Sequence, residues 1–171
     1  MNPIARLLRP AHDTRGELRP LWRAVVVEAR DARWYRELGA ADSLAGRFDM
    51  VTLVLAVVLL RLEREDAGGE GCARLTELFI EDMDAQLRQS GVGDLVVGKH
   101  VGKLMATLGG RLGALREALG ADEAELVEVV GRNATLRDGH DAAPLASALR
   151  ALHARLAAVP MARLLAGELT A

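Results

Sequence analysis

The hydrophobic pattern of residues 75–119 predicts two helices joined by a tight corner. In the first helix, apolar residues recur at the three- and four-residue intervals that place them on one face: Leu75, Leu78, Phe79, Met83 and Leu87. In the second helix the same spacing runs from Val97 to Leu119. The corner is Gly91-Val92-Gly93-Asp94, in which Gly91 suits the left-handed residue that ends a helix and Asp94 can cap the next. We therefore expect a helix pair at about 72–90 and 94–119.

Two further helices are predicted before this pair. The first is expected from Pro20 to about Leu38, because proline is favoured in the first turn of a helix. The second is expected at about 44–65 and is apolar on every side between Met50 and Leu60. A helix without a polar face is buried, so this segment should form the centre of the bundle.

The C-terminal third of the chain predicts shorter helices. Asp122 and Glu125 match a capping box that opens a helix at about 123–136. Leucines with helical spacing follow from Leu145 to Leu156, and Pro160 ends that helix before a short one at about 161–166. We find no strand pattern. The sequence thus predicts an all-α, single-domain, irregular bundle of about six to seven helices around the buried central helix and the helix pair. Residues 20–171 form the helical domain, and residues 1–19 are a flexible basic N-terminal arm.

Composition narrows the class of protein. The chain has 171 residues, of which 50% are hydrophobic and 27% charged, so it is long and apolar enough for a core. A net charge of −2 argues against bulk or specific DNA binding. The longest apolar run, Met50 to Leu60, is interrupted only by Thr52 and would span about 16 Å as a helix, roughly half of a bilayer core. It is therefore expected to be a buried helix and not a membrane span.

Residues with catalytic or metal-binding spacing are missing from the sequence. The four histidines are scattered, and Cys72 is the only cysteine, so a zinc site and an intramolecular disulfide are not expected. Phosphate-binding glycine loops and the GxSxG motif are absent. Asp82 and Asp84 point apart, because residues i and i+2 of a helix do not share a face. We expect no enzyme, no catalytic residue, no cofactor and no metal; an enzyme would need a polar pocket around Asp82 or His100.

The second helix of the pair carries glycines that a bundle does not need. Gly98, Gly102, Gly109 and Gly113 line one flank of its apolar stripe. Each costs about 1 kcal/mol against alanine, or roughly 4 kcal/mol together, within a typical stability of about 5–15 kcal/mol. Close approach of a second backbone would offset this cost, and that backbone belongs either to a partner helix or to a neighbouring helix of the same domain.

The chain's only lysines, Lys99 and Lys103, lie roughly opposite that flank. At i,i+4 they repel each other slightly, so they do not strengthen the helix. They are candidates to meet a phosphate or an acidic partner; the alternative is a solvated face.

Several short motifs together suggest a family. In the helix pair they are Leu78-Phe79, Asp82-Met83-Asp84, Leu87-Arg88, Gly91-Val92-Gly93-Asp94-Leu95, Val97-Gly98-Lys99 and Lys103-Leu104-Met105. Elsewhere they are Trp34-Tyr35-Arg36-Glu37-Leu38-Gly39, Gly46-Arg47-Phe48-Asp49, Arg132-Asn133 and Leu164-Leu165-Ala166-Gly167. With these, residues 20–168 resemble the ubiquinol–cytochrome c chaperone family, the assembly factors of the cytochrome bc1 complex. The chain departs from the family pattern at Val54, where a histidine is usual, at Ala134 and Thr135, where an aromatic is usual, and in lacking a Phe-Pro ending.

The resemblance implies a soluble all-helical protein that attends newly made cytochrome b. In mitochondria such proteins work at the ribosome exit with a small partner protein. Because this chain has no convincing presequence, we interpret it as a bacterial member that is cytoplasmic or peripheral at the inner face of the cytoplasmic membrane. The implied client is cytochrome b or another bc1 subunit, and the ribosome and the membrane surface are further candidate partners.

The hypothesis for the site is an apolar groove beside the helix pair that receives a client helix. Phe79, Met83, Val97, Val101 and Met105 would line it; the alternative is that they are ordinary core. Asp82 is expected to pair with a buried arginine, Arg47 or Arg61, or else to contact a partner. The alternative function is a non-catalytic helical adaptor or a homodimeric interaction module that uses the same groove. The candidate client- or partner-binding residues are Phe79, Asp82, Met83, Asp84, Arg88, Gly91, Gly93, Asp94, Val97, Gly98, Lys99, Val101, Gly102, Lys103 and Met105.

Overall fold

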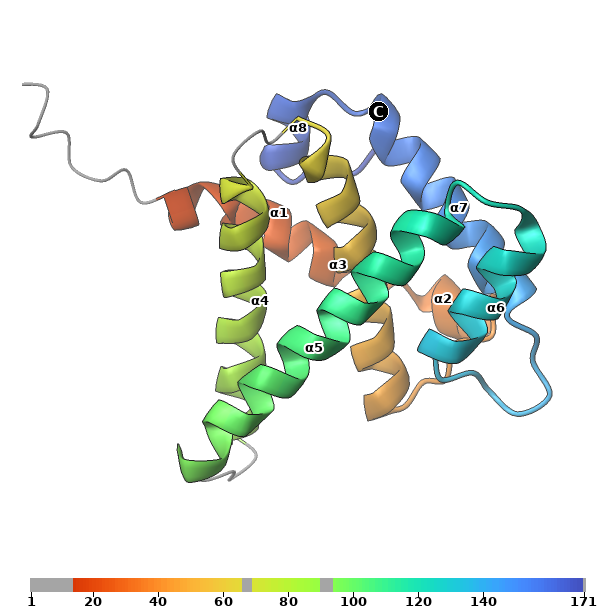
Figure 1. The fold of residues 1–171 in the computed structure, drawn as a ribbon, viewed down its shortest axis with the longest axis horizontal. Helices are drawn as coiled ribbons and strands as arrows, with labels where there is room; N and C mark the ends of the chain where they lie inside the picture. The colour runs from red at the N-terminus through yellow and green to blue at the C-terminus, as the bar shows by residue number, and fades with distance from the viewer. Residues whose placement is uncertain (1–13, 66–68, 90–93, 171) are drawn as a thin grey trace, which may run out of the picture.

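The computed structural model describes residues 14–65, 69–89 and 94–170, with side chains for 18–65, 69–86 and 100–170. Within these ranges the chain forms eight helices: α1 (Thr14–Ala29), α2 (Ala32–Arg36), α3 (Leu44–Glu63), α4 (Glu70–Gln89), α5 (Asp94–Ala118), α6 (Glu123–Asn133), α7 (Ala143–Ala158) and α8 (Met161–Leu165). The predicted all-α, single-domain bundle and its helix pair are confirmed (Figure 1). The helix count is higher because the segment predicted as one helix from Pro20 to Leu38 forms two, α1 and the five-residue α2.

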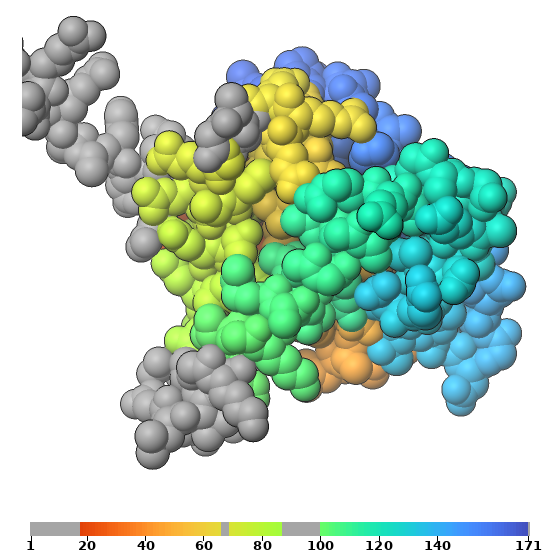
Figure 2. All heavy atoms as spheres, viewed as in Figure 1, coloured from red at the N-terminus to blue at the C-terminus, as the bar shows by residue number. Residues whose placement is uncertain are grey.

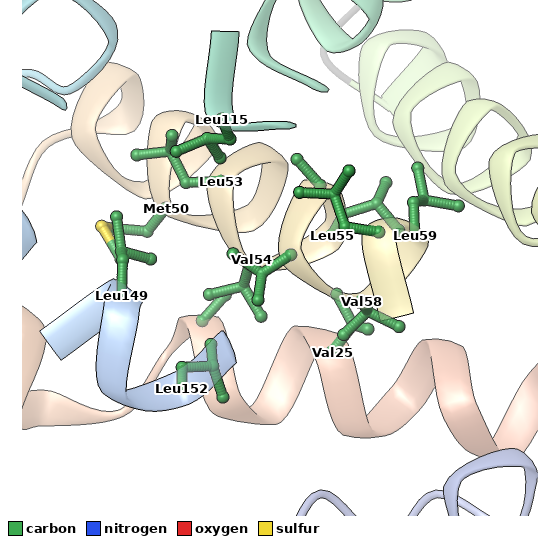
Figure 3. Close-up of a cluster of buried hydrophobic side chains, with 14 of the residues drawn as sticks. Val25, Met50, Leu53, Val54, Leu55, Val58, Leu59, Leu115, Leu149 and Leu152 are labelled. Atoms are coloured by element: carbon green, nitrogen blue, oxygen red, sulfur yellow. The ribbon is translucent and has the colours of Figure 1, made fainter. Parts of the chain in front are cut away.

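Helix α3 is the centre of the bundle, as its apolar sequence predicts. Every residue from Asp49 to Leu62 is buried. Neighbours on all sides explain this, because α3 packs against α1, α4, α5 and α7. Figure 3 shows side chains of α3 directed toward Val25 of α1, Leu115 of α5, and Leu149 and Leu152 of α7. The Ser43 side chain caps its first turn by accepting a hydrogen bond from the Gly46 amide at 3.1 Å.

The N-terminal helix differs from its predicted bounds at both ends. It begins at Thr14, so Pro20 lies inside it. The apolar spacing continues upstream of the proline, and Leu18 and Leu21 are both buried in the core, which favours a helix across this point. The helix ends at Ala29 because two aromatic side chains take its last carbonyls. Trp34 donates its indole N–H to the Glu28 carbonyl at 2.8 Å, and the Tyr35 hydroxyl donates to the Ala29 carbonyl at 2.7 Å.

Helices α4 and α5 form the pair on which the site is built. α4 packs on α1 and α3, and α5 crosses the bundle diagonally over α3 to reach α6 (Figure 1). Of the predicted corner Gly91-Val92-Gly93-Asp94, the first three residues lie outside the described residues, and α5 begins at Asp94. Among the described helices, none is long and apolar enough to cross a membrane.

Candidate functional site

An open groove of about 520 Å³ runs between α4 and α5. Figure 2 shows the face of the molecule on which these two helices lie side by side. Leu59 of α3 contributes to the floor, and α5 contributes Met105 and Leu112, two turns apart. Met105 is 46% exposed. The α4 wall consists of residues at helical spacing: Cys72, Ala73, Thr76, Glu77, Ile80 and Glu81.

The glycine flank of α5 faces open space. Among the described residues, a Cβ atom built at Gly102, Gly109 or Gly113 would meet no atom of another part of the chain within 4 Å. At about 100° per residue, these glycines lie beside Met105 on the outer side of the groove. No helix of the described residues therefore packs on this flank, and the prediction that it seats a neighbouring helix of the same domain is wrong for these three positions. Within the described fold, no contact offsets the free energy that these glycines cost the helix relative to alanine.

The α4 border of the groove is acidic. Glu77 and Glu81 line the groove, and Asp84 follows on the same side of the helix about one turn later. Arg74 contacts Glu77 at 3.2 Å and Glu70 at 3.9 Å, which offsets part of this charge. The groove is thus apolar on its α5 side and bordered by carboxylates on its α4 side.

The predicted lining residues are divided between core and groove. Phe79 is fully buried and packs edge-on against Trp22 with ring centroids 6.0 Å apart, so it belongs to the core and does not line the groove. Met83 is half-buried and packs against the core. Val101 is half-buried, and Met105 lines the groove. Phe79 is therefore an ordinary core residue, whereas Met105 lies in the groove as the hypothesis expects.

The other candidate residues are placed as follows. Lys103 and Gly102 are exposed, and Asp82 and Asp84 are half-buried. The structure describes the backbone but not the side-chain surroundings of five candidates: Arg88, Asp94, Val97, Gly98 and Lys99. Two further candidates, Gly91 and Gly93, lie outside the described residues.

The predicted buried pair of Asp82 with Arg47 or Arg61 is not what the structure shows. Arg47 donates to Asp42 at 2.6 Å on the surface. Arg61 is buried and donates to the carbonyls of Leu156 and Val159, both at 3.0 Å, at the end of α7. The last turn of α7 needs such donors, since its carbonyls lack partners within the helix.

The buried carboxylate–arginine pair is instead Asp49 with Arg111. Arg111 donates to Asp49 at 2.5 Å and also to the Thr52 hydroxyl. The second carboxylate oxygen of Asp49 accepts from the Thr135 amide at 2.8 Å and from its hydroxyl at 2.6 Å. The sequence contained one sign of this buried pair, because Arg111 interrupts the apolar stripe of α5. The network fixes α5 on α3, and the groove-facing side of α5, about 100–120° around the helix from Arg111, stays open.

A smaller cavity of about 300 Å³ lies at the C-terminal end of α5. Its lining includes Arg64, Arg116 and His153. Arg64 donates to Nε2 of His153 at 3.1 Å, and Arg116 contacts Glu63 at 2.8 Å. Burial, and then the nearby Arg64 guanidinium, lowers the pKa of His153 below its usual 6.5. In the described residues, no group of three or more metal-ligating side chains comes together.

Comparisons with known proteins agree on one family. The family described as "Ubiquinol-cytochrome C chaperone" matches residues 36–171. Among solved structures, the chain is similar to the crystal structure of the Cbp3 homolog from Brucella abortus, with a TM-score of 0.77 and 27% sequence identity over 96% of this chain and 94% of that one. No curated protein matches the chain.

Proposed function

This chain belongs to the ubiquinol–cytochrome c chaperone family, and from that premise we propose that it is an assembly factor of the cytochrome bc1 complex that binds newly made cytochrome b. The proposed binding site is the groove between α4 and α5. The role is non-catalytic: the chain covers apolar surface of its client until that surface is buried in the assembled complex.

The observation that carries this proposal is the unfilled apolar surface beside α5. Met105 is 46% exposed in the groove, and the flank formed by Gly102, Gly109 and Gly113 meets no other part of the chain that the structure describes. Glycines allow a second helix to come close to α5, as small residues do between membrane helices. An exposed methionine adapts to irregular apolar surfaces, which suits a client that is not yet folded.

A membrane protein subunit is a suitable client for such a surface. Before insertion or assembly its helices expose apolar side chains to water, at a cost of about 25 cal/mol for each Å². A groove with Leu59 in its floor and Met105 and Leu112 on one wall removes part of that area from water. The homodimer or adaptor alternative predicts that a second copy of the chain fills the same groove.

Deletion of the gene, followed by complementation, tests the proposal. We expect the deletion strain to lose assembled bc1 complex and haem b, and the wild-type gene to restore both. Met105→Glu should fail to restore them, because a charge would enter the groove. Leu44→Glu is the matched control, since Leu44 is 87% exposed at the start of α3 and does not line the groove. Protein levels of both variants should equal those of the wild type.

Two results would contradict the proposal. A normal amount of bc1 complex in the deletion strain would show that assembly of the complex does not need this protein. Full restoration of the bc1 complex by the Met105→Glu variant would show that the groove is not the binding site. Dimerisation of the purified chain that Met105→Glu abolishes, without any loss of bc1 complex in cells, would favour the homodimeric module.

A further inference from the structure

A row of exposed side chains on α1 forms a basic stripe, defined as Arg19, Arg23, Val27 and Arg30. We infer that this stripe docks the protein on an anionic membrane surface. The guanidinium groups contact lipid phosphates, and Val27 enters the boundary between head groups and acyl chains. The stripe is a second interaction surface, separate from the groove, and its role does not depend on the proposed client.

The four side chains of the stripe share one side of the helix. Arg30 directly follows α1, and its amide donates to the Val26 carbonyl at 3.1 Å, so it continues the last turn. At about 100° per residue, the stripe occupies a sector of about 80° and extends for about 16 Å along the helix. The opposite side of α1, which includes Leu21 and Val25, is buried in the core. The helix thus presents a straight row of side chains that can contact a flat surface along its whole length.

The arginines of the stripe lack the carboxylate partners that other surface arginines have. Arg116, for example, contacts Glu63 at 2.8 Å. Within the residues that the structure describes, the side chains of the three arginines of the stripe are exposed and make no hydrogen bond or ion pair. The stripe is therefore a local excess of positive charge on a chain whose net charge is −2. Such a local excess of charge attracts an anionic partner.

Val27 favours a lipid surface over RNA as that partner. Its side chain is 72% exposed between Arg23 and Arg30, where it contributes nothing to the binding of phosphates. At a membrane interface the combination is favourable, because basic side chains reach the lipid phosphates while an apolar neighbour leaves water. Proteins that bind the bases of RNA stack them on exposed aromatic side chains. The only aromatic residue of α1, Trp22, is buried in the core.

Docking through the stripe leaves the groove accessible. The buried side of α1 packs against α3 and α4, so the stripe on the opposite side is directed away from both helices. In Figure 1, α1 passes behind α4, and Figure 2 shows in the same view the face on which α4 and α5 lie side by side. The protein can therefore hold a client in the groove while the stripe contacts a membrane.

Co-sedimentation of the purified full-length chain with lipid vesicles tests the inference. We expect binding to vesicles made of equal parts of phosphatidylglycerol and phosphatidylcholine, and much weaker binding to vesicles of phosphatidylcholine alone. Added salt should weaken the binding to the anionic vesicles, because it screens exposed charges.

Variants of the stripe should reduce binding to the anionic vesicles. Arg19→Gln with Arg23→Gln should lower the binding constant about 25-fold, since each arginine near an anionic membrane contributes about fivefold. Arg19→Lys with Arg23→Lys keeps the charge and should retain most of the binding. Val27→Ser should lower the binding constant about fivefold, because the apolar contact is lost.

Matched variants separate the stripe from total charge and from the groove. Arg116→Gln with Arg132→Gln removes the same charge from α5 and α6, where both arginines contact carboxylates, and should leave vesicle binding close to that of the wild type. Met105→Glu should also bind vesicles as the wild type does, so that failure of the groove as a client site would leave this inference standing. Thermal unfolding of each variant verifies that the fold is retained.

Three results would overturn the inference. The first is that the wild type does not bind anionic vesicles. The second is an equal loss of binding in the two glutamine double variants, since net charge alone would then explain it. The third is that the chain binds an RNA oligonucleotide more tightly than the anionic vesicles and that Arg19→Gln with Arg23→Gln abolishes the RNA binding, which would assign the stripe to RNA.

Discussion

Asp49 of α3 and Arg111 of α5, which are 62 positions apart, form a buried ion pair that fixes the long diagonal helix on the core. Thr52 and Thr135 satisfy further hydrogen bonds of the same two side chains. The pair lies on the inner side of α5, whereas Met105 and Leu112 on another side line the groove. One helix thus combines a rigid attachment with an open binding surface.

Removing one partner of this pair should strongly destabilise the fold. Asp49→Ala leaves the Arg111 guanidinium buried without its carboxylate, and breaking a buried pair costs about 3–5 kcal/mol. Urea unfolding measures the free energy. Glu128→Ala, which removes the exposed i,i+4 partner of Arg132, is the control and should change it by less than about 0.5 kcal/mol. A cost for Asp49→Ala as small as the control's would show that the pair does not stabilise the protein.

Two glycines should respond in opposite directions to alanine. A Cβ atom at Gly46 would lie 2.0 Å from the Ala41 carbonyl oxygen, so Gly46→Ala forces the backbone apart and should cost more than about 1 kcal/mol. A Cβ atom at Gly110 meets no neighbour within 4 Å, and Gly110→Ala should stabilise α5 by about 0.5–1 kcal/mol. Chemical denaturation of the two variants tests this. Equal effects of the same sign would contradict it.

The groove flank should show a conflict between stability and function. Gly109→Leu should stabilise the fold by about the same amount as Gly110→Leu, because both positions are open and leucine favours a helix. Gly109 lies one turn from Met105, whereas Gly110 is turned away from the groove by about 140°. We therefore expect Gly109→Leu, but not Gly110→Leu, to weaken the binding of an apolar client peptide. Unchanged peptide binding by Gly109→Leu would mean that no helix approaches this flank.

His153 should make stability depend on pH in a known direction. Its pKa is lowered in the folded protein, first by burial and then by Arg64, so the unfolded chain takes up the proton more readily. The stabilising contribution is fully present above about pH 6.5 and is lost as the pH falls below 6.5 toward the folded pKa. The difference in unfolding free energy between wild type and His153→Gln should thus shrink in that window. Arg64→Met should lessen the effect, and a difference that is independent of pH would contradict the assignment.

The sequence was sufficient for the parts of the fold that depend on local pattern. The apolar run from Met50 to Leu60 predicted the buried central helix, and the Asp122 cap is present, with its carboxylate accepting from the Glu125 amide at 2.9 Å. Motifs of the helix pair also identified the family that the comparison supports. Periodicity and capping are properties of neighbouring residues, so a single sequence contains them.

Features that depend on distant contacts could not be predicted in this way. Asp82 was an equally plausible buried carboxylate, and only the packing of α5 on α3 shows that Asp49 has that role. Phe79 shares its apolar pattern with Met105, yet Phe79 packs into the core against Trp22 and Met105 lines the groove. The crossing angle of two helices decides which residues of a stripe they cover, and spacing alone does not give that angle.

The central claim is that newly made cytochrome b occupies the groove between α4 and α5, and site-specific photo-crosslinking tests it most directly. A photoreactive amino acid replaces Met105 in the groove or, as controls, the exposed apolar residues Leu44 and Val27. We predict a crosslink to newly made cytochrome b from position 105 and none from positions 44 and 27. Crosslinks of equal strength from all three positions, or a crosslink from position 105 only to a second copy of the chain, would contradict the claim.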